Sequence, residues 1–253
     1  MKSLFLSALL ALVSLNVAAD ALIAVASNFS QCFNTLKTEF EKDSSHTVLA
    51  SFGSSAALFA QIRHGAPFDA FLSADRDKPT RLIERGLAIE KSQYSYAYGD
   101  LVLWSISFPI NDQSLRQVLQ NASVKKIAMA KPQLAPYGTA AEQVLVRLNV
   151  IDQLRPQLVY GENITQAFQF VRSKNAQLGF IAKAQQRSLN LPVSHTMEVP
   201  THLYSAIRQD AVLLSRGAQN ATAIAFLASM RSKQGIETIK QCGYRRPIDG
   251  GIL

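Results

Sequence analysis

The sequence predicts an α/β protein with two lobes, each built on a mainly parallel sheet flanked by helices. Short apolar runs alternate with amphipathic helical periods along residues 21–85, and this alternation is typical of parallel strands covered on both faces. The pattern restarts after Pro109, which favours a second lobe over one wider sheet. The chain has 253 residues, enough for two lobes with separate cores.

Residues 1–19 have the pattern of a secretory signal peptide. Lys2 precedes an apolar run at residues 4–13, and small residues lead to Ala19 just before Asp20. The run is too short to span a membrane comfortably, and the residues after it are small rather than basic. We therefore expect cleavage after Ala19 and export from the cytoplasm.

The first lobe is predicted from strand and helix periods that follow each other closely. Phe29, Cys32 and Phe33 lie on one stripe of the helical pattern over residues 29–42, and Gly86 ends the last helix of this stretch. The predicted strands are Ala21–Ala26, 47–52 and 68–73, and the predicted helices are 29–42, 56–64 and 76–85.

The second lobe begins after two further predicted strands, 94–98 and 101–106, which Gly99 and Asp100 separate. This stretch and residues 199–207 are the expected crossings between the lobes. The predicted boundaries are 20–98 and 205–253 for the first lobe and 99–204 for the second. Strands are expected at 126–130, 157–160, Leu178–Ala182, 203–207 and 211–214, and helices at Leu115–Leu119, 140–148, Ile164–Arg172, 218–230 and 235–242.

Polar residues recur where a predicted strand passes into a helix, two such places in each half. In doubly wound sheets these positions face the ligand cleft. The first N–H groups of a helix have no internal partner, and the helix dipole places partial positive charge there, so these ends suit a small anion. Helix capping alone is the alternative for any single segment. The four places are Ser27-Asn28, Ser54-Ser55, Tyr137-Gly138 and Asn163-Ile164.

The sequence lacks the motifs of the common catalytic and metal sites. Its four histidines are isolated, and Ser54 and Ser55 do not lie in a Gly-x-Ser-x-Gly turn. Asp69 and Asp75 are expected to set a turn and to cap a helix. Tyr94, Tyr96 and Tyr98 share one face of a strand, where packing between lobes explains them more simply than iron binding.

The charge and the cysteines bear on partners and compartment. The formal net charge is +8, but the cations are scattered and form no basic run interleaved with aromatics, so we expect no nucleic-acid partner. Cys32 and Cys242 are the only cysteines. They are either two buried thiols or a disulfide, and an oxidising compartment favours the disulfide.

A series of motifs covers nearly the whole mature chain. They are AVASNF at 24–29, SFGSS at 51–55, GAPFD at 65–69, YGDLVLW at 98–104, APYG at 135–138, GENI at 161–164 and LGFIA at 178–182. In this order they resemble the periplasmic molybdate-binding proteins, the solute-binding components of molybdate ABC transporters. The resemblance implies a type II-like periplasmic-binding-protein fold, with the oxyanion in the cleft between the lobes.

The resemblance also implies a ligand set. Ser27 and Ser55 would donate hydroxyls, Tyr137 and Ile164 would donate backbone N–H groups, and Asn28 would be an extra donor. One branch of the family adds a tyrosine hydroxyl where this chain has Ala182. Molybdenum would thus be held as an oxyanion, with no direct bond from the protein to the metal.

Molybdate suits such a site because it is a fully deprotonated dianion that only accepts hydrogen bonds. The resemblance implies a periplasmic monomer that binds molybdate, and tungstate as well, needs no cofactor, catalyses no reaction and docks on a membrane permease. Two alternatives remain at this stage. One is a receptor for sulfate or another tetrahedral oxyanion, and the other is a secreted hydrolase that uses a serine in the cleft.

Overall fold

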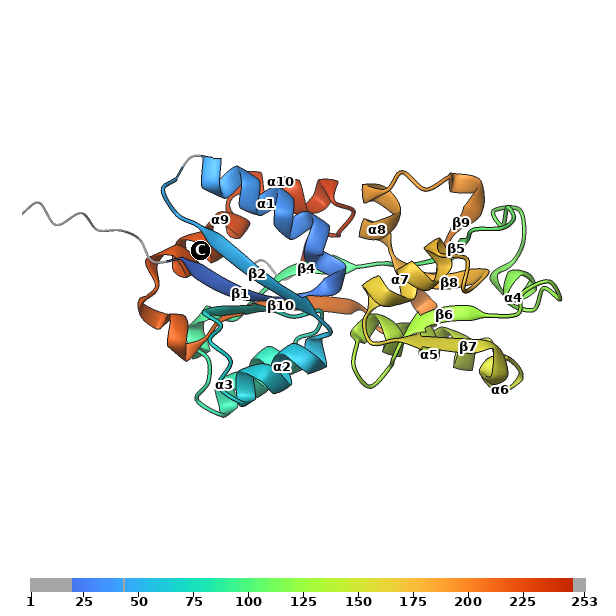
Figure 1. Cartoon of the computed structure of the whole chain (residues 1–253), viewed down its shortest axis with the longest axis horizontal. Helices are drawn as coiled ribbons and strands as arrows, with labels where there is room; N and C mark the ends of the chain where they lie inside the picture. The colour runs from blue at the N-terminus through green and yellow to red at the C-terminus, as the bar shows by residue number, and fades with distance from the viewer. Residues whose placement is uncertain (1–19, 43, 248–253) are drawn as a thin grey trace, which may run out of the picture.

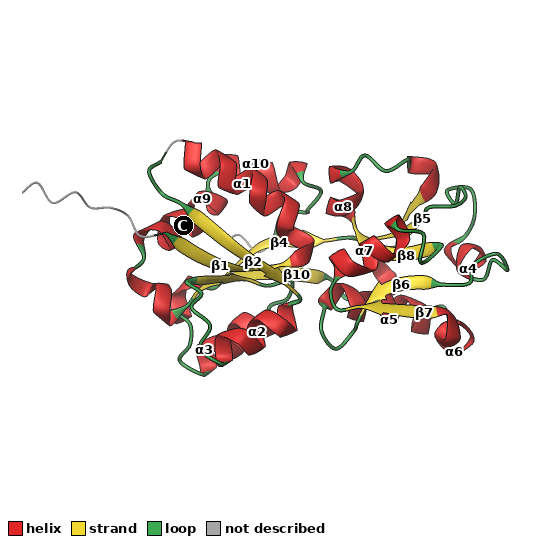
Figure 2. Ribbon diagram, viewed as in Figure 1, coloured by secondary structure: helices red, strands yellow, loops and turns green. Residues whose placement is uncertain are grey.

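The computed structural model describes residues 20–42 and 44–247, and these form two five-stranded sheets flanked by helices. Figures 1 and 2 show the two sheets as separate bodies that lie side by side along the longest axis of the molecule. The strand order is β2-β1-β3-β10-β4 in the first sheet and β7-β6-β8-β5-β9 in the second. The predicted signal peptide lies outside the described residues.

The first sheet is mixed rather than mainly parallel. Its strands are β1 (Ala21–Ala26), β2 (Val48–Gly53), β3 (Ala70–Leu72), β4 (Tyr94–Gly99) and β10 (Ile207–Leu213). β1 pairs in parallel with β2 and β3, whereas β10 runs antiparallel to β3 and β4. The antiparallel pairs arise because β4 leaves for the other body and β10 returns from it.

Helices cover both faces of this sheet. They are α1 (Ser30–Lys42), α2 (Ser55–Arg63), α3 (Asp77–Glu84), α9 (Ala221–Arg231) and α10 (Lys233–Gln241). On one face Phe33 of α1 packs against Phe226 of α9, with ring centroids 5.2 Å apart. On the other face, Leu58 of α2 and Leu82 of α3 belong to a separate apolar cluster. Figure 1 shows α1 and α10 on one side of the sheet and α2 and α3 on the other.

The second body has one apolar core around another mixed sheet. Trp104 stacks on Phe168 inside it, with centroids 4.9 Å apart. Here β6 pairs in parallel with β7 and β8, and β5 runs antiparallel to β8 and β9. The strands are β5 (Leu101–Ser105), β6 (Ile127–Ala130), β7 (Leu158–Gly161), β8 (Leu178–Ala182) and β9 (Thr196–Glu198). The helices are α4 (Leu115–Leu119), α5 (Pro136–Arg147), α6 (Ile151–Leu154), α7 (Ile164–Arg172) and α8 (Lys183–Ser188).

The chain leaves the first sheet after β4 and returns to it with β10, and some local predictions of strands and helices were wrong. Residues 203–207 were expected to be extended, whereas a 3-10 turn occupies Thr201–Leu203 and β10 starts only at Ile207. The helix predicted at 140–148 begins at Pro136, because proline lacks the N–H that a first helical residue would leave unpaired. The 3-10 turns are η1 (Ser27–Phe29), η2 (Glu90–Ser92), η3 (Arg155–Gln157), η4 (Val193–His195), η5 (Thr201–Leu203) and η6 (Ser215–Gln219).

A disulfide joins the two ends of the described chain. Cys32 in α1 and Cys242 just after α10 are bonded, with Cα atoms 5.7 Å apart. Both helices lie in the first body, so the bond closes one lobe on itself. Among the described residues, no helix has the length and apolar character that crossing a membrane requires.

Candidate functional site

Four strand-to-helix junctions supply the predicted site residues, two from each body. β1 leads into η1, β2 into α2, β6 into α5 and β7 into α7. Two hydrogen bonds join the bodies at these junctions. Thr165 Oγ1 donates to the carbonyl of Ser27 at 3.2 Å, and the N–H of Ala56 donates to the carbonyl of Leu134 at 3.1 Å. The structure thus brings helix starts of the two bodies against each other.

At the start of α2, neighbouring serines have different roles. Ser54 caps the helix, because its Oγ accepts the N–H of Ala57 at 3.4 Å. Ser55 is almost completely buried, and its Oγ accepts the N–H of Ala74 at 3.0 Å. Its hydroxyl proton remains available to donate. As the first residue of the helix, Ser55 also has an N–H with no carbonyl partner inside α2.

The start of α7 is arranged in the same way. Asn163 Oδ1 accepts the N–H groups of Thr165 and Gln166, both at 3.0 Å. The cap therefore satisfies the second and third N–H groups and leaves that of Ile164, the first residue of α7, without an intrahelical partner. Ile164 is buried, and its carbonyl accepts from Gln185 Nε2 at 3.5 Å. The helix thus presents one backbone donor at its buried end.

The start of α5 presents Tyr137. Pro136 takes the first helical position, and the N–H groups of Gly138 and Thr139 both donate to the carbonyl of Ala135, at 2.8 and 3.1 Å. Tyr137 lies between Pro136 and Gly138, and because proline has no N–H, the N–H of Tyr137 is the first one that the helix carries. A side chain at Gly138 would come within 2.3 Å of the Ala130 carbonyl, so glycine lets the helix start lie close to β6.

At the junction after β1, Ser27 and Asn28 are both buried. The side chain of Asn28 is engaged by the protein itself. Its Nδ2 donates to Gln209 Oε1 at 2.7 Å and to Tyr244 Oη at 3.2 Å. Both side-chain amide protons of Asn28 thus have acceptors within the first body. The side chain that was expected to be an extra donor is therefore directed into the protein. Tyr244 Oη in turn donates to the Asn28 carbonyl at 2.7 Å.

The position that carries a tyrosine in one branch of the family is not a side-chain donor here. Ala182 ends β8 and is completely buried. Its N–H donates to Gln185 Oε1 at 3.0 Å, in front of α8. Among the predicted site residues, the side-chain hydroxyls of Ser27 and Ser55 therefore belong to the first body, while the second body presents backbone N–H groups.

The site has few groups that change charge. Burial raises the pKa of Tyr137 well above its ordinary value, so its hydroxyl stays protonated. Within residues 20–42 and 44–247, no histidine or carboxylate bonds to Ser55, so the serine lacks a base. Nor do the described residues contain a group of three or more His, Cys, Asp or Glu side chains that could hold a metal.

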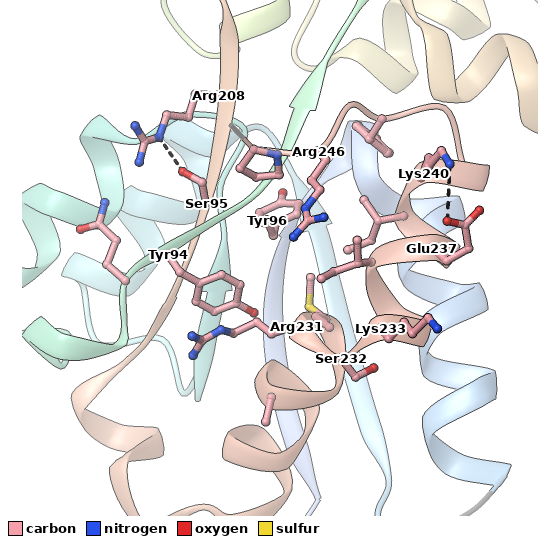
Figure 3. Close-up of a pocket in the computed structure, with 17 residues that line it drawn as sticks. Tyr94, Ser95, Tyr96, Arg208, Arg231, Ser232, Lys233, Glu237, Lys240 and Arg246 are labelled. Atoms are coloured by element: carbon pink, nitrogen blue, oxygen red, sulfur yellow. Dashed lines mark hydrogen bonds and ion pairs between the residues drawn. The ribbon is translucent and has the colours of Figure 1, made fainter. Parts of the chain in front are cut away.

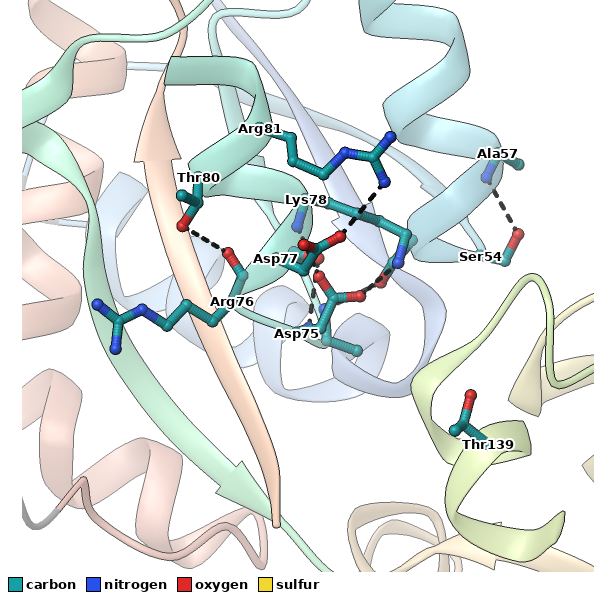
Figure 4. A network of polar contacts seen from close by, with 12 residues as sticks. Ser54, Ala57, Asp75, Arg76, Asp77, Lys78, Thr80, Arg81 and Thr139 are labelled. Carbon is teal, nitrogen blue, oxygen red and sulfur yellow. Dashed lines mark hydrogen bonds and ion pairs between the residues drawn. The ribbon is translucent and has the colours of Figure 1, made fainter. Parts of the chain in front are cut away.

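A polar network borders the site on one side (Figure 4). Asp75 accepts the N–H of Lys78 at 2.9 Å and its Nζ at 2.6 Å, as expected for a residue at a helix start. A pocket of about 330 Å³ separates this network from the start of α5, where Figure 4 shows Thr139. The same pocket is lined by Ala74, whose N–H bonds to Ser55, so it adjoins the helix starts.

A groove of about 1260 Å³ lies elsewhere, on the first body between β4 and α10 (Figure 3). Its walls include Tyr94 and Tyr96 as well as the cations Arg231, Lys233 and Lys240. None of the five predicted ligand residues lines it. The tyrosines of β4 pack inside the first body rather than between the lobes, since Tyr94 Oη donates to the Leu227 carbonyl at 2.8 Å.

Several residues beneath the site were not predicted from the sequence. Gln209, Tyr244 and Tyr96 contact Asn28 or its partners, yet they lie far from it in the chain. One signal was present: the polar residues 208–210 interrupt the apolar residues of β10, and two of them, Gln209 and Asp210, are completely or almost completely buried. A buried polar pair of this kind is expected to have specific partners.

Comparison with known proteins gives consistent matches over almost the whole chain. The model of the family described as bacterial extracellular solute-binding protein matches residues 21–245. Molybdate-binding protein ModA of Azotobacter vinelandii is 40% identical over 229 residues, or 90% of each chain. Molybdate-binding protein ModA of Rhodobacter capsulatus is 39% identical over 227 residues, or 90% of this chain and 88% of that protein. The solved structure of the Azotobacter vinelandii periplasmic molybdate-binding protein has a TM-score of 0.84 and 35% identity, covering 90% of this chain and 99% of that one.

Proposed function

The chain belongs to the bacterial extracellular solute-binding proteins, and we propose that it captures molybdate and delivers it to an ABC importer. The observation that carries this proposal is the set of unpaired donors at the helix starts. Caps at α2 and α7 satisfy later N–H groups and leave those of Ser55 and Ile164 without intrahelical partners. Relatives that are 39–40% identical carry the name molybdate-binding protein.

The chemistry of the donors fits a fully deprotonated anion. Backbone N–H groups and serine hydroxyls can all donate to molybdate, which has only acceptor oxygens. A protonated phosphate would bring an O–H that finds no acceptor, which disfavours it. Helix dipoles and hydrogen bonds to a charged group supply the stabilisation, so no buried lysine or arginine is required.

The proposed ligand set keeps all five predicted residues but changes the role of one. Ser27 and Ser55 donate hydroxyls, and Tyr137 and Ile164 donate backbone N–H groups. Asn28 contributes through its backbone, because its two side-chain protons are already bonded to Gln209 and Tyr244. The anion thus lies between the bodies and draws donors from both.

The remaining functional expectations follow from this role. We propose that the chain loses its signal peptide after Ala19 and works in the periplasm as a monomer without a cofactor. It binds tungstate as well as molybdate, passes the anion to a membrane permease, does not bind nucleic acid and catalyses no reaction. The absence of a base bonded to Ser55 supports binding rather than hydrolysis.

Thermal unfolding with four anions tests the proposal. A ligand at one hundred times its dissociation constant stabilises the folded state by about 2.7 kcal/mol. Micromolar molybdate or tungstate should raise the melting temperature clearly. Sulfate has shorter bonds to oxygen and would leave donors unpaired at about 1–3 kcal/mol each, so the same concentration of sulfate or phosphate should barely change it. An equal shift with sulfate would reduce the function to general oxyanion binding.

A further inference from the structure

A buried polar network centred on Gln209 lies beneath the helix starts of the first body. Gln209 belongs to β10 and has no exposed surface. Its Oε1 accepts from Asn28 Nδ2 at 2.7 Å and lies 3.1 Å from Tyr96 Oη. Tyr96 Oη is also 3.1 Å from the carbonyl of Ser73. One glutamine of β10 is thus connected to η1, to β4 and, through Tyr96, to the residue that follows β3.

The network extends to two residues of the proposed ligand set. Asn28 is held directly by Gln209. Ser55 is reached through the backbone after β3, because Ala74, next to Ser73, donates its N–H to Ser55 Oγ at 3.0 Å. Gln209 therefore fixes the positions of two helix starts from below, without lying among the donors itself.

Two atoms of this region lack hydrogen-bond partners within the described parts of the chain. They are Gln209 Nε2 in the first body and Tyr137 Oη in the second, and both are buried. Both lie against Gly99 at the crossing between the bodies. A Cβ built on Gly99 would be 2.0 Å from Tyr137 Oη and 2.8 Å from Gln209 Nε2, so the two atoms are no farther apart than the sum of these distances.

Leaving two buried polar groups unpaired is unfavourable, and a small relative movement of the bodies could pair them. Binding supplies a reason for that movement, because the anion requires donors from both bodies at once. Tyr137 would connect binding with this movement, because its backbone N–H belongs to the proposed ligand set and its hydroxyl lies against Gly99 at the crossing.

We propose that Gln209 is a positioning residue for the anion site, and that its amide forms a hydrogen bond with Tyr137 Oη when molybdate draws the two lobes together. The inference rests on the proposed function and adds to it a bond between lobes that does not touch the anion. Gly99 gives the two groups room, because any side chain there would occupy the space in which they meet.

Tyr137→Phe tests the bond with little change in shape. In the unliganded protein it removes a buried hydroxyl that has no partner, so the melting temperature should stay equal or rise. In the loaded protein it removes the bond between lobes, so molybdate affinity measured by calorimetry should fall about 2- to 12-fold. A merely structural role for the hydroxyl would lower the melting temperature.

Tyr204→Phe is the matched control at the same crossing. Tyr204 is also buried, but its Oη already accepts the N–H of Leu101 at 3.1 Å. Its loss should lower the melting temperature of the unliganded protein and leave affinity for molybdate within about 2-fold of wild type. Tyr137→Phe should therefore lower molybdate affinity without lowering the melting temperature, and Tyr204→Phe should lower the melting temperature without lowering affinity.

A double-mutant cycle with Gln209→Met identifies the partner. The single Gln209 variant should weaken molybdate binding more than Tyr137→Phe, because it also releases Asn28 and Tyr96. In the Gln209→Met background, Tyr137→Phe should cause almost no further loss. If Gln209→Met does not fold, Tyr137→Phe alone still tests the bond between lobes: molybdate affinity should fall while the melting temperature of the unliganded protein stays equal or rises.

The outcomes separate this inference from the proposed function. If the wild-type protein does not bind molybdate, the proposed function fails. If the wild type binds and Tyr137→Phe has unchanged affinity, the bond between lobes is refuted. Fully independent effects of the Tyr137 and Gln209 substitutions would likewise refute the pairing.

Discussion

At the residue scale, the two serines before and at the start of α2 show how position decides function. Ser54 Oγ accepts the N–H of Ala57 and caps the helix, whereas Ser55 Oγ accepts from Ala74 and keeps its hydroxyl proton available to donate. We predict that Ser55→Ala weakens molybdate binding about 10- to 150-fold, since a hydrogen bond to a charged group contributes about 1.5–3 kcal/mol. Isothermal titration calorimetry measures the change.

Ser54→Ala is the natural control. It should cost about 0.5–2 kcal/mol of folding stability through loss of the cap and have the smaller effect on affinity. A larger loss of affinity for Ser54→Ala would mean that the assignment of donors is shifted by one residue. In that case the hydroxyl and the N–H of Ser55, the first residue of α2, would not bind the anion together.

The proposed donor residues could be predicted from the sequence, but the residues that hold them in place could not. Ser27, Ser55 and Ile164 were predicted because each lies at a local strand-to-helix junction. Gln209 and Tyr244 hold Asn28 across long stretches of the chain, and such contacts leave no local periodicity. This is also why the side chain of Asn28 was expected to be a ligand donor.

At the element scale, strand β4 carries tyrosines whose burial has a pH consequence. Burial raises the pKa of both Tyr94 and Tyr96. Above about pH 10 the unfolded chain loses tyrosine protons that the folded chain keeps, so folding stability falls as pH rises, by up to about 1.4 kcal/mol per pH unit for each tyrosine. Tyr94→Phe should therefore make the loss of stability between pH 8 and pH 11 smaller.

Urea unfolding at the two pH values measures this effect. If Tyr94→Phe and wild type lose the same free energy of unfolding between the two pH values, burial of Tyr94 does not govern its titration.

The elements also show where periodicity is sufficient and where it is not. The βα units at β1, β2, β6 and β7 were predicted because each follows a local apolar period. The antiparallel strands β9 and β10 were harder, since their pairing depends on how the chain returns from the second body. The short helix α8 was not predicted, and its sequence, KAQQRS, has too few apolar residues to show a helical period.

At the scale of the whole molecule, two bodies joined by two crossings bring helix starts from both bodies against each other. The disulfide between Cys32 and Cys242 and the apolar cores stabilise each body separately, while contacts such as Thr165 to Ser27 join them at the site. We therefore expect anion binding and relative movement of the lobes to be linked through the same four helix starts.

A crystal structure of the protein with molybdate, with anomalous scattering recorded at the molybdenum absorption edge, tests this account most directly. We predict one strong anomalous peak between the two bodies. The oxygens of the anion at this peak should accept hydrogen bonds from Ser55 Oγ and from the N–H groups of Tyr137 and Ile164. A peak instead in the basic groove beside Arg231 and Lys240, or no peak between the bodies at saturating molybdate, would contradict the account.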